Sequence, residues 1–164
     1  MSQAPLPILI LSGIRAAQCL KNKLPPKYSC VYNQPLSGHG GSVTIYDNTL
    51  FFPIKVVSPS PGINFILGEY AQNRIIIGNV YIHPNEWFDA LSKKEVLFDA
   101  FSSLQKLAME YERIPILIAG DLNMKPTEVG KTLSLFPILQ QNFGLHIFDD
   151  YQTVLPITES MKER

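Results

Sequence analysis

The sequence has few cysteines and no long apolar run. Its 164 residues include two cysteines, Cys19 and Cys30, too few for a disulfide framework. No uninterrupted apolar run is longer than Ile8–Leu11, whereas a transmembrane helix needs about 20 apolar residues. We therefore expect reduced thiols, an intracellular location in the cytoplasm or nucleus, and no membrane partner.

The chain also lacks net charge, because 14 Lys and Arg balance 14 Asp and Glu. A neutral protein does not have the general attraction to polyanions that a basic protein has, so any contact with nucleic acid is expected to be weak or local. No carboxylate occurs before Asp47. A reaction that uses an acidic side chain must therefore take it from residue 47 onward.

What is present predicts one α/β domain over residues 1–164. Hydrophobic residues make up 46% of the chain, which is enough for a folded core. Paired apolar stretches predict two hairpins, and an amphipathic pattern between two further apolar stretches predicts a β–helix–β unit. The expected hairpins cover residues 43–57 and 63–82. The expected β–helix–β unit has a strand at 74–82, a helix at 97–111 and a strand at 114–119, and an earlier strand covers 8–11. Strands 8–11 and 114–119 are expected to be buried. The fold class is a layered α/β sandwich with mixed sheets and outer helices.

The most informative motif is Gly120-Asp121-Leu122-Asn123, which ends an apolar strand. Side chains two residues apart on an extended backbone point the same way, so Asp121 and Asn123 are expected to face one site. An ionised aspartate can orient and deprotonate water, and an asparagine amide can donate to a phosphate oxygen. Glycine, aspartate and asparagine also favour turns, so the spacing alone leaves a structural turn open.

Several segments, in the right order, resemble the endonuclease/exonuclease/phosphatase family, which includes apurinic endonucleases and pancreatic deoxyribonuclease. Residues 114–123 resemble its signature strand, and 77–85 is similar to its strand ending in Tyr-x-Pro-Asn, with one extra residue. Residues 38–46 resemble its glycine-led strand, and 145–151 resembles a later segment of non-LTR retrotransposon endonucleases. The resemblance implies a metal-dependent phosphodiesterase that hydrolyses phosphodiester bonds, with DNA as the expected substrate and partner.

The resemblance also implies roles for single residues. Asp121 is the expected water-activating carboxylate, and Asn123 is its phosphate-binding partner. Tyr81 is expected beside the scissile phosphate as a hydroxyl donor, with Asn85 near the same group. A sheet tyrosine with an exposed hydroxyl is the alternative for Tyr81. His39, which precedes two glycines, is a candidate phosphate contact, and a loop histidine is the alternative.

The chain departs from the family pattern at the metal site. The family uses Mg²⁺, a hard cation with oxygen ligands, and its chief ligand is a glutamate at the end of an early strand. Residues 8–15 resemble that strand, but Gly13 stands at the glutamate position. The family's first strand and its closing Ser-Asp-His segment have no counterpart here, so the resemblance describes a domain truncated at both ends. We therefore expect poor Mg²⁺ binding, impaired hydrolysis, and association through exposed sheet edges.

Two other interpretations stay open from the sequence. In one, a non-catalytic domain uses the same fold to bind nucleic acid or a protein. In the other, the chain is an unrelated α/β protein in which Gly120–Asn123 is only a turn. If the family resemblance holds, the substrate is still open among DNA, RNA, a phosphoinositide and a small phosphoester.

Overall fold

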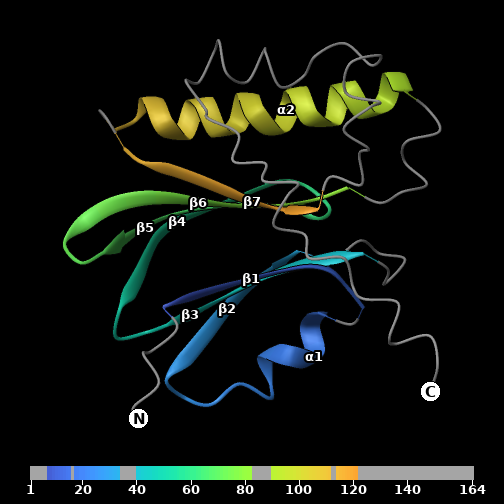
Figure 1. The fold of residues 1–164 in the computed structure, drawn as a ribbon. Helices are drawn as coiled ribbons and strands as arrows, with labels where there is room; N and C mark the ends of the chain where they lie inside the picture. The colour runs from blue at the N-terminus through green and yellow to red at the C-terminus, as the bar shows by residue number, and fades with distance from the viewer. Residues whose placement is uncertain (1–6, 16, 34–39, 83–89, 112–113, 122–164) are drawn as a thin grey trace, which may run out of the picture. The chain divides into compact units, whose positions relative to one another are not determined.

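The computed structural model describes residues 7–15, 17–33, 40–82, 90–111 and 114–121 (Figure 1). All of them belong to one compact unit, Met1–Met124. Two sheets face each other within this unit, and a long helix covers the outer face of the larger sheet. The predicted α/β sandwich is therefore confirmed. That residues 1–164 form a single domain stays a prediction.

The smaller sheet contains three antiparallel strands in the order β1-β3-β2. Its elements are β1 (Ile8–Ile14), β2 (Tyr28–Asn33) and β3 (Gly41–Asp47), with the short helix α1 (Ala17–Lys21) between β1 and β2. The central strand β3 is almost wholly buried, whereas β1 lies at one edge and its Leu9 is 38% exposed. The strand predicted at Ile8–Leu11 is confirmed in place, but the prediction that it is buried is wrong, because among the described residues only β3 pairs with it.

The larger sheet has the order β4-β5-β6-β7. Its elements are β4 (Phe51–Ser60), β5 (Ile63–Tyr70), β6 (Asn73–Tyr81) and β7 (Ile116–Asp121), and helix α2 (Ala90–Met109) joins β6 to β7. Strands β4 to β6 are antiparallel, and β7 is parallel to β6, so the predicted hairpin over 63–82 and the β–helix–β unit are both confirmed.

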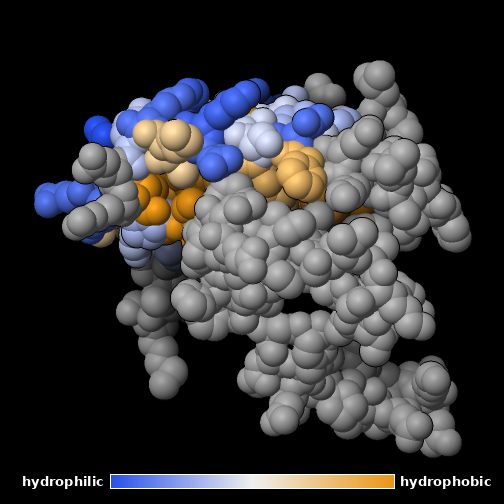
Figure 2. All heavy atoms as spheres, turned by 90° about the horizontal axis from the view of Figure 1, so that it is seen from above, coloured by the Kyte–Doolittle hydropathy of each residue, from blue (hydrophilic) through white to orange (hydrophobic). Residues whose placement is uncertain are grey.

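Helix α2 packs through one apolar stripe. Leu97, Ala100, Leu104 and Leu107 recur at three- or four-residue steps and are buried, as an amphipathic helix requires. Phe101 extends the stripe, and its ring centroid lies 6.5 Å from that of Phe65 on β5. Figure 2 views this side and shows polar side chains along the helix with apolar residues beside it. Within the described residues, no helix has the length and apolar character needed to cross a membrane.

The two outer strands of the larger sheet expose apolar side chains. Leu117 of β7 is 54% exposed, so the prediction of a fully buried strand at 114–119 is wrong. The strand has β6 on one side only in the described sheet, which the sequence could not reveal. At the opposite edge, β4 exposes Phe52, Ile54 and Val56. Association through such edges stays a prediction.

The hairpin predicted over residues 43–57 is wrong, because β3 and β4 belong to different sheets. Tyr46 and Phe51, on either side of the connection, are buried and pack edge to face with ring centroids 5.5 Å apart. Tyr46 of β3 and Phe51 of β4 join one buried cluster with Ile66 and Ile77 and do not pair across a hairpin. Strand β4 also runs on to Ser60, beyond the end of the predicted hairpin at residue 57.

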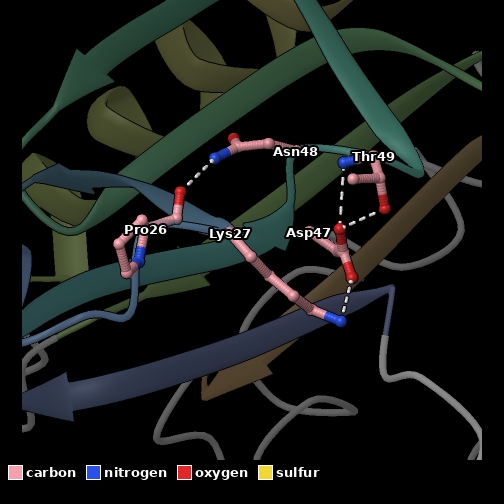
Figure 3. A network of polar contacts seen from close by, with 5 residues as sticks. All are labelled: Pro26, Lys27, Asp47, Asn48 and Thr49. Carbon is pink, nitrogen blue, oxygen red and sulfur yellow. Dashed lines mark hydrogen bonds and ion pairs between the residues drawn. The ribbon is translucent and has the colours of Figure 1, made fainter.

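Asp47 fixes the corner at which the chain leaves one sheet for the other (Figure 3). Its Oδ1 accepts hydrogen bonds from the Thr49 hydroxyl at 2.6 Å and the Thr49 amide at 2.9 Å. Its Oδ2 lies 2.9 Å from Nζ of Lys27. The Asn48 side chain adds a bond of 3.3 Å to the carbonyl oxygen of Pro26. The corner thus depends on contacts with the segment before β2, not on local turn propensity alone.

We predict that this corner makes the fold sensitive to acid. Hydrogen bonds from the Thr49 hydroxyl, from Lys27 and from the Thr49 amide lower the pKa of Asp47 from 3.8 to about 2. Because the folded-state pKa is lowered, the stabilisation is present above the ordinary pKa and is lost as pH falls toward about 2. Urea unfolding across this range should show a fall in stability that is smaller in Asp47→Asn. Parallel pH profiles for the two proteins would contradict this role.

Candidate functional site

Three strands bring Gly13, Tyr81 and Asp121 to one end of the sandwich. Strands β6 and β7 are parallel, and their register pairs Tyr81 directly with Asp121. The Tyr81 ring lies against Gly13 of β1, since a Cβ atom on Gly13 would be 3.1 Å from Cε2 of the ring. Asp121 is exposed and Tyr81 is half-buried. The structure therefore brings together two of the predicted site residues and the position where the family resemblance places a glutamate.

Gly120 allows β7 to approach β6 closely enough for this pairing. Its φ is +142°, and a Cβ atom there would lie 1.9 Å from the carbonyl oxygen of Val80. The next residue continues the ladder, because the carbonyl oxygen of Asp121 accepts a 3.0 Å bond from the Ile82 amide. Gly120 and Asp121 thus lie in a paired strand, and the interpretation of the motif as only a turn is wrong for these two residues.

A fully buried asparagine lies two residues before Tyr81 on β6. Nδ2 of Asn79 donates to the carbonyl oxygens of Leu11 and Val43, both at 3.1 Å, and lies 3.4 Å from the Thr44 hydroxyl. Its Oδ1 accepts a 2.9 Å bond from the Ser12 hydroxyl. Our sequence reasoning missed Asn79. The available signal was a polar residue inside an apolar strand, which must find hydrogen-bond partners when it is buried.

Two more asparagines extend this polar layer between the sheets. Nδ2 of Asn64 donates to the Ser42 hydroxyl at 2.8 Å, and its Oδ1 accepts from the Ser58 hydroxyl at 2.8 Å. Nδ2 of Asn33 donates to the carbonyl oxygens of Ser60 and Ile63. Hydrogen bonds are directional, whereas apolar contacts are not, so this layer fixes how the two sheets align.

The described residues do not supply the ligand set of the Mg²⁺ site that the resemblance implies. Gly13 has a φ of +72°, and a Cβ atom there would lie 3.1 Å from the Tyr81 ring, which would have to move by a few tenths of an ångström to admit a side chain. Within the described part of the chain, no three His, Cys, Asp or Glu residues cluster in a way that could hold a metal. Of the three residues that meet here, only Asp121 carries a carboxylate, and Mg²⁺ prefers oxygen ligands.

Restoring a glutamate at Gly13 is therefore expected to destabilise the protein without creating a metal site. Gly13→Glu and Gly13→Ala should each lower the free energy of unfolding by roughly 1–2 kcal/mol, because both require a positive φ of a residue with a Cβ. Urea unfolding measures this loss, and calorimetric titration with Mg²⁺ should show no gain in affinity. Tight Mg²⁺ binding by Gly13→Glu would contradict the steric argument.

A double-mutant cycle separates the two sources of this loss. Tyr81→Ala removes the ring that the new Cβ would meet, so the part of the loss caused by the contact should disappear when it is combined with Gly13→Ala. The part caused by the backbone should remain. Strict additivity of the two substitutions would show that the ring does not constrain Gly13.

The other predicted site residues lie outside the described residues. These are Asn123, Asn85 and His39. The 145–151 segment, which entered the resemblance, also lies outside them. The roles assigned to these residues remain predictions.

Comparison with known proteins supports the fold. No family model matches the chain, and no curated protein sequence does. Truncated Caenorhabditis elegans TDP2 is similar in structure with a TM-score of 0.52 at 14% identity, covering 74% of this chain and 51% of that one. D. rerio TDP2 humanized by 14 mutations gives 0.52 at 14% identity, covering 78% of this chain and 53% of that one.

A third solved structure, D. rerio TDP2 complexed with single strand DNA product, has a TM-score of 0.50 at 13% identity and covers 76% of this chain and 51% of that one. At these identities the similarity concerns the fold. The chain has the fold of these TDP2 structures, an endonuclease/exonuclease/phosphatase-like fold such as the sequence motifs predicted. It spans about half the length of those solved chains.

Proposed function

We propose that this chain is a phosphodiesterase-like domain that binds DNA at the end of the sandwich where Gly13, Tyr81 and Asp121 meet, and that it hydrolyses phosphodiester bonds at an impaired rate. The observation that carries the proposal is the register of β6 and β7, which pairs Tyr81 with Asp121. The fold it shares with TDP2 supports the same reaction class, and the D. rerio complex with a single strand DNA product supports DNA as the substrate. Such a substrate fits an intracellular location.

The proposed reaction is attack of water on phosphorus. Asp121 orients the water and takes its proton, a bond forms from the water oxygen to phosphorus, and the bond to the leaving oxygen breaks while that oxygen takes a proton from solvent water. The Tyr81 hydroxyl donates to a non-bridging phosphate oxygen, where charge grows during the reaction. Asn123 donates to the same phosphate, and Asn85 and His39 contribute further phosphate contacts.

The slow rate of the proposed hydrolysis is expected because Gly13 stands where the family has a glutamate. In the family, Mg²⁺ offsets negative charge on the phosphate, and the glutamate at this position is its chief ligand. The described residues do not fit that metal, so we assign no step to it. Loss of preorganised positive charge removes one of the largest contributions to such catalysis, which makes a slow reaction the expected one.

Nicking of supercoiled DNA by the purified full chain tests the proposal. Prolonged incubation at high protein concentration with Mg²⁺ should give slow conversion to the nicked form, and a parallel sample with EDTA should nick at a similar rate, because no metal step is assigned. Rapid nicking that EDTA abolishes would contradict the impairment. No nicking together with no binding of DNA would overturn the proposal.

The alternative is a non-catalytic domain that binds DNA or a protein partner, and Gly13 at the expected ligand position favours it. The two functions differ in whether DNA binding is accompanied by cleavage. Filter binding of a single-stranded oligonucleotide at two salt concentrations should show a steep loss of affinity with salt if phosphates are contacted. Such binding without any nicking supports the non-catalytic function.

A further inference from the structure

We propose that Asn79 is a positioning residue, whose side-chain amide locks β1 against β6 and so holds Gly13 under the ring of Tyr81. The inference rests on the proposed function, because it names the residue that shapes the proposed phosphate-binding end. Asn79 itself is fully buried and does not touch the substrate.

Asn79 is placed to connect the two sheets close to the candidate site. On β6 it lies two residues before Tyr81, and in the parallel register it pairs with Ala119, two residues before Asp121. Its partners on β1 are the carbonyl oxygen of Leu11 and the hydroxyl of Ser12, which directly precede Gly13. The Asn79 side chain therefore connects β6 with β1 at positions just before Tyr81 and Gly13, which meet at the candidate site.

The Asn79 side chain does more than join β1 to β6, because it has a third partner on another strand of the smaller sheet. Nδ2 of Asn79 also donates to the carbonyl oxygen of Val43 on β3, the central strand of the smaller sheet. Val43 pairs with Leu11 in the β1–β3 ladder, so the amide bridges both members of one register pair. A shift of β1 along β3 would separate Leu11 from Val43 and break one of the two bonds.

The need for this lock follows from the place of β1 in the sheet. Strand β1 is an edge strand of the described smaller sheet, and its register is irregular between Ser12 and Ile14. Apolar packing between sheets resists separation but resists sliding less, because it is not directional. Hydrogen bonds in a buried layer resist sliding, since each displaced donor or acceptor would remain unsatisfied.

Asn64 offers a matched control. It is also fully buried in the layer between the sheets, and its side chain also bonds to hydroxyl groups, those of Ser42 and Ser58. It lies on β5, near the start of that strand, and these two bonds lead to β3 and β4. Asn79→Leu and Asn64→Leu therefore remove comparable polar groups, but the bonds to β1 are lost only in the first.

The direct measurement is the NMR spectrum of the full chain labelled at glycine. The ring of Tyr81 lies so close to Gly13 that its ring current should displace the Gly13 proton resonances from their usual positions. We expect Asn79→Leu to abolish this displacement and Asn64→Leu to retain it. Affinity for a single-stranded oligonucleotide should fall about fivefold in Asn79→Leu and change little in Asn64→Leu.

Each outcome decides the proposal. A folded Asn79→Leu protein with unchanged Gly13 resonances would overturn it, and so would loss of the displacement in both variants, since the effect would then belong to the whole polar layer. If Asn79→Leu does not fold, Asn79→Ser, which keeps a smaller polar group, is judged on the same resonances. If wild type binds no DNA while Gly13 still responds to Asn79, the proposed function fails and the positioning role stands.

Discussion

Gly120→Ala is expected to detach the end of β7 from β6 and to lower the free energy of unfolding by about 4 kcal/mol or more. The added Cβ would lie 1.9 Å from the oxygen, 2.7 Å from the carbon and 2.8 Å from the nitrogen of Val80, all of them backbone atoms. No rotamer change can relieve such an overlap. The φ of +142° adds strain, because side-chain-bearing residues rarely adopt it.

The loss should be concentrated at the candidate site. Separation of the strands breaks the bond from the Ile82 amide to the Asp121 carbonyl oxygen and the pairing of Tyr81 with Asp121. Urea unfolding followed by circular dichroism measures the total loss. Hydrogen exchange at Ile82 shows whether the strand end is the part that opens.

Gly78→Ala is the control for a glycine in the same sheet. Its Cβ would lie 3.1 Å from side-chain atoms of Ile118 and Phe65, which can move by a few tenths of an ångström. We expect a loss of about 1–3 kcal/mol for this overpacking. A Gly120→Ala protein as stable as wild type, or less affected than Gly78→Ala, would contradict the close approach of β6 and β7.

Elements that depend on neighbours in the sequence were predictable. The apolar stripe of α2 and the hairpin of β5 and β6 follow from periodicity within a short segment, and the glycine and aspartate that end β7 form one motif. That Tyr81 and Asp121 lie at the same edge also follows, because a β–helix–β unit brings the carboxyl ends of two parallel strands together, whereas their direct pairing depends on the register.

Elements that depend on distant partners were not predictable. At the corner after Asp47, where the chain crosses between the sheets, the carboxylate pairs with Lys27 from another segment. The sequence around Asn79 does not reveal its partners, because its side chain bonds to groups on β1 and β3. The exposure of Leu117 depends on which strands lie beside β7, a property of the sheet order.

Asp121→Asn is expected to lower the residual rate of DNA nicking by roughly 10²-fold or more, the contribution typical of a general base. The amide keeps the size and shape of the carboxylate but cannot take the proton of the attacking water. Nicking of supercoiled DNA by equal amounts of the two proteins measures the change. Asp99→Asn is the control, because Asp99 is an exposed carboxylate on α2 that is outside the candidate site.

This substitution separates the chemistry from the fold, because Asp121 joins the sheet through its backbone. The carbonyl oxygen of Asp121 accepts the bond from the Ile82 amide, and asparagine retains that bond. Matching urea unfolding curves for Asp121→Asn and wild type would show that the strand end is intact, so a loss of nicking would then belong to the carboxylate. Equal nicking by the two proteins would remove Asp121 from the proposed reaction and leave the non-catalytic alternative.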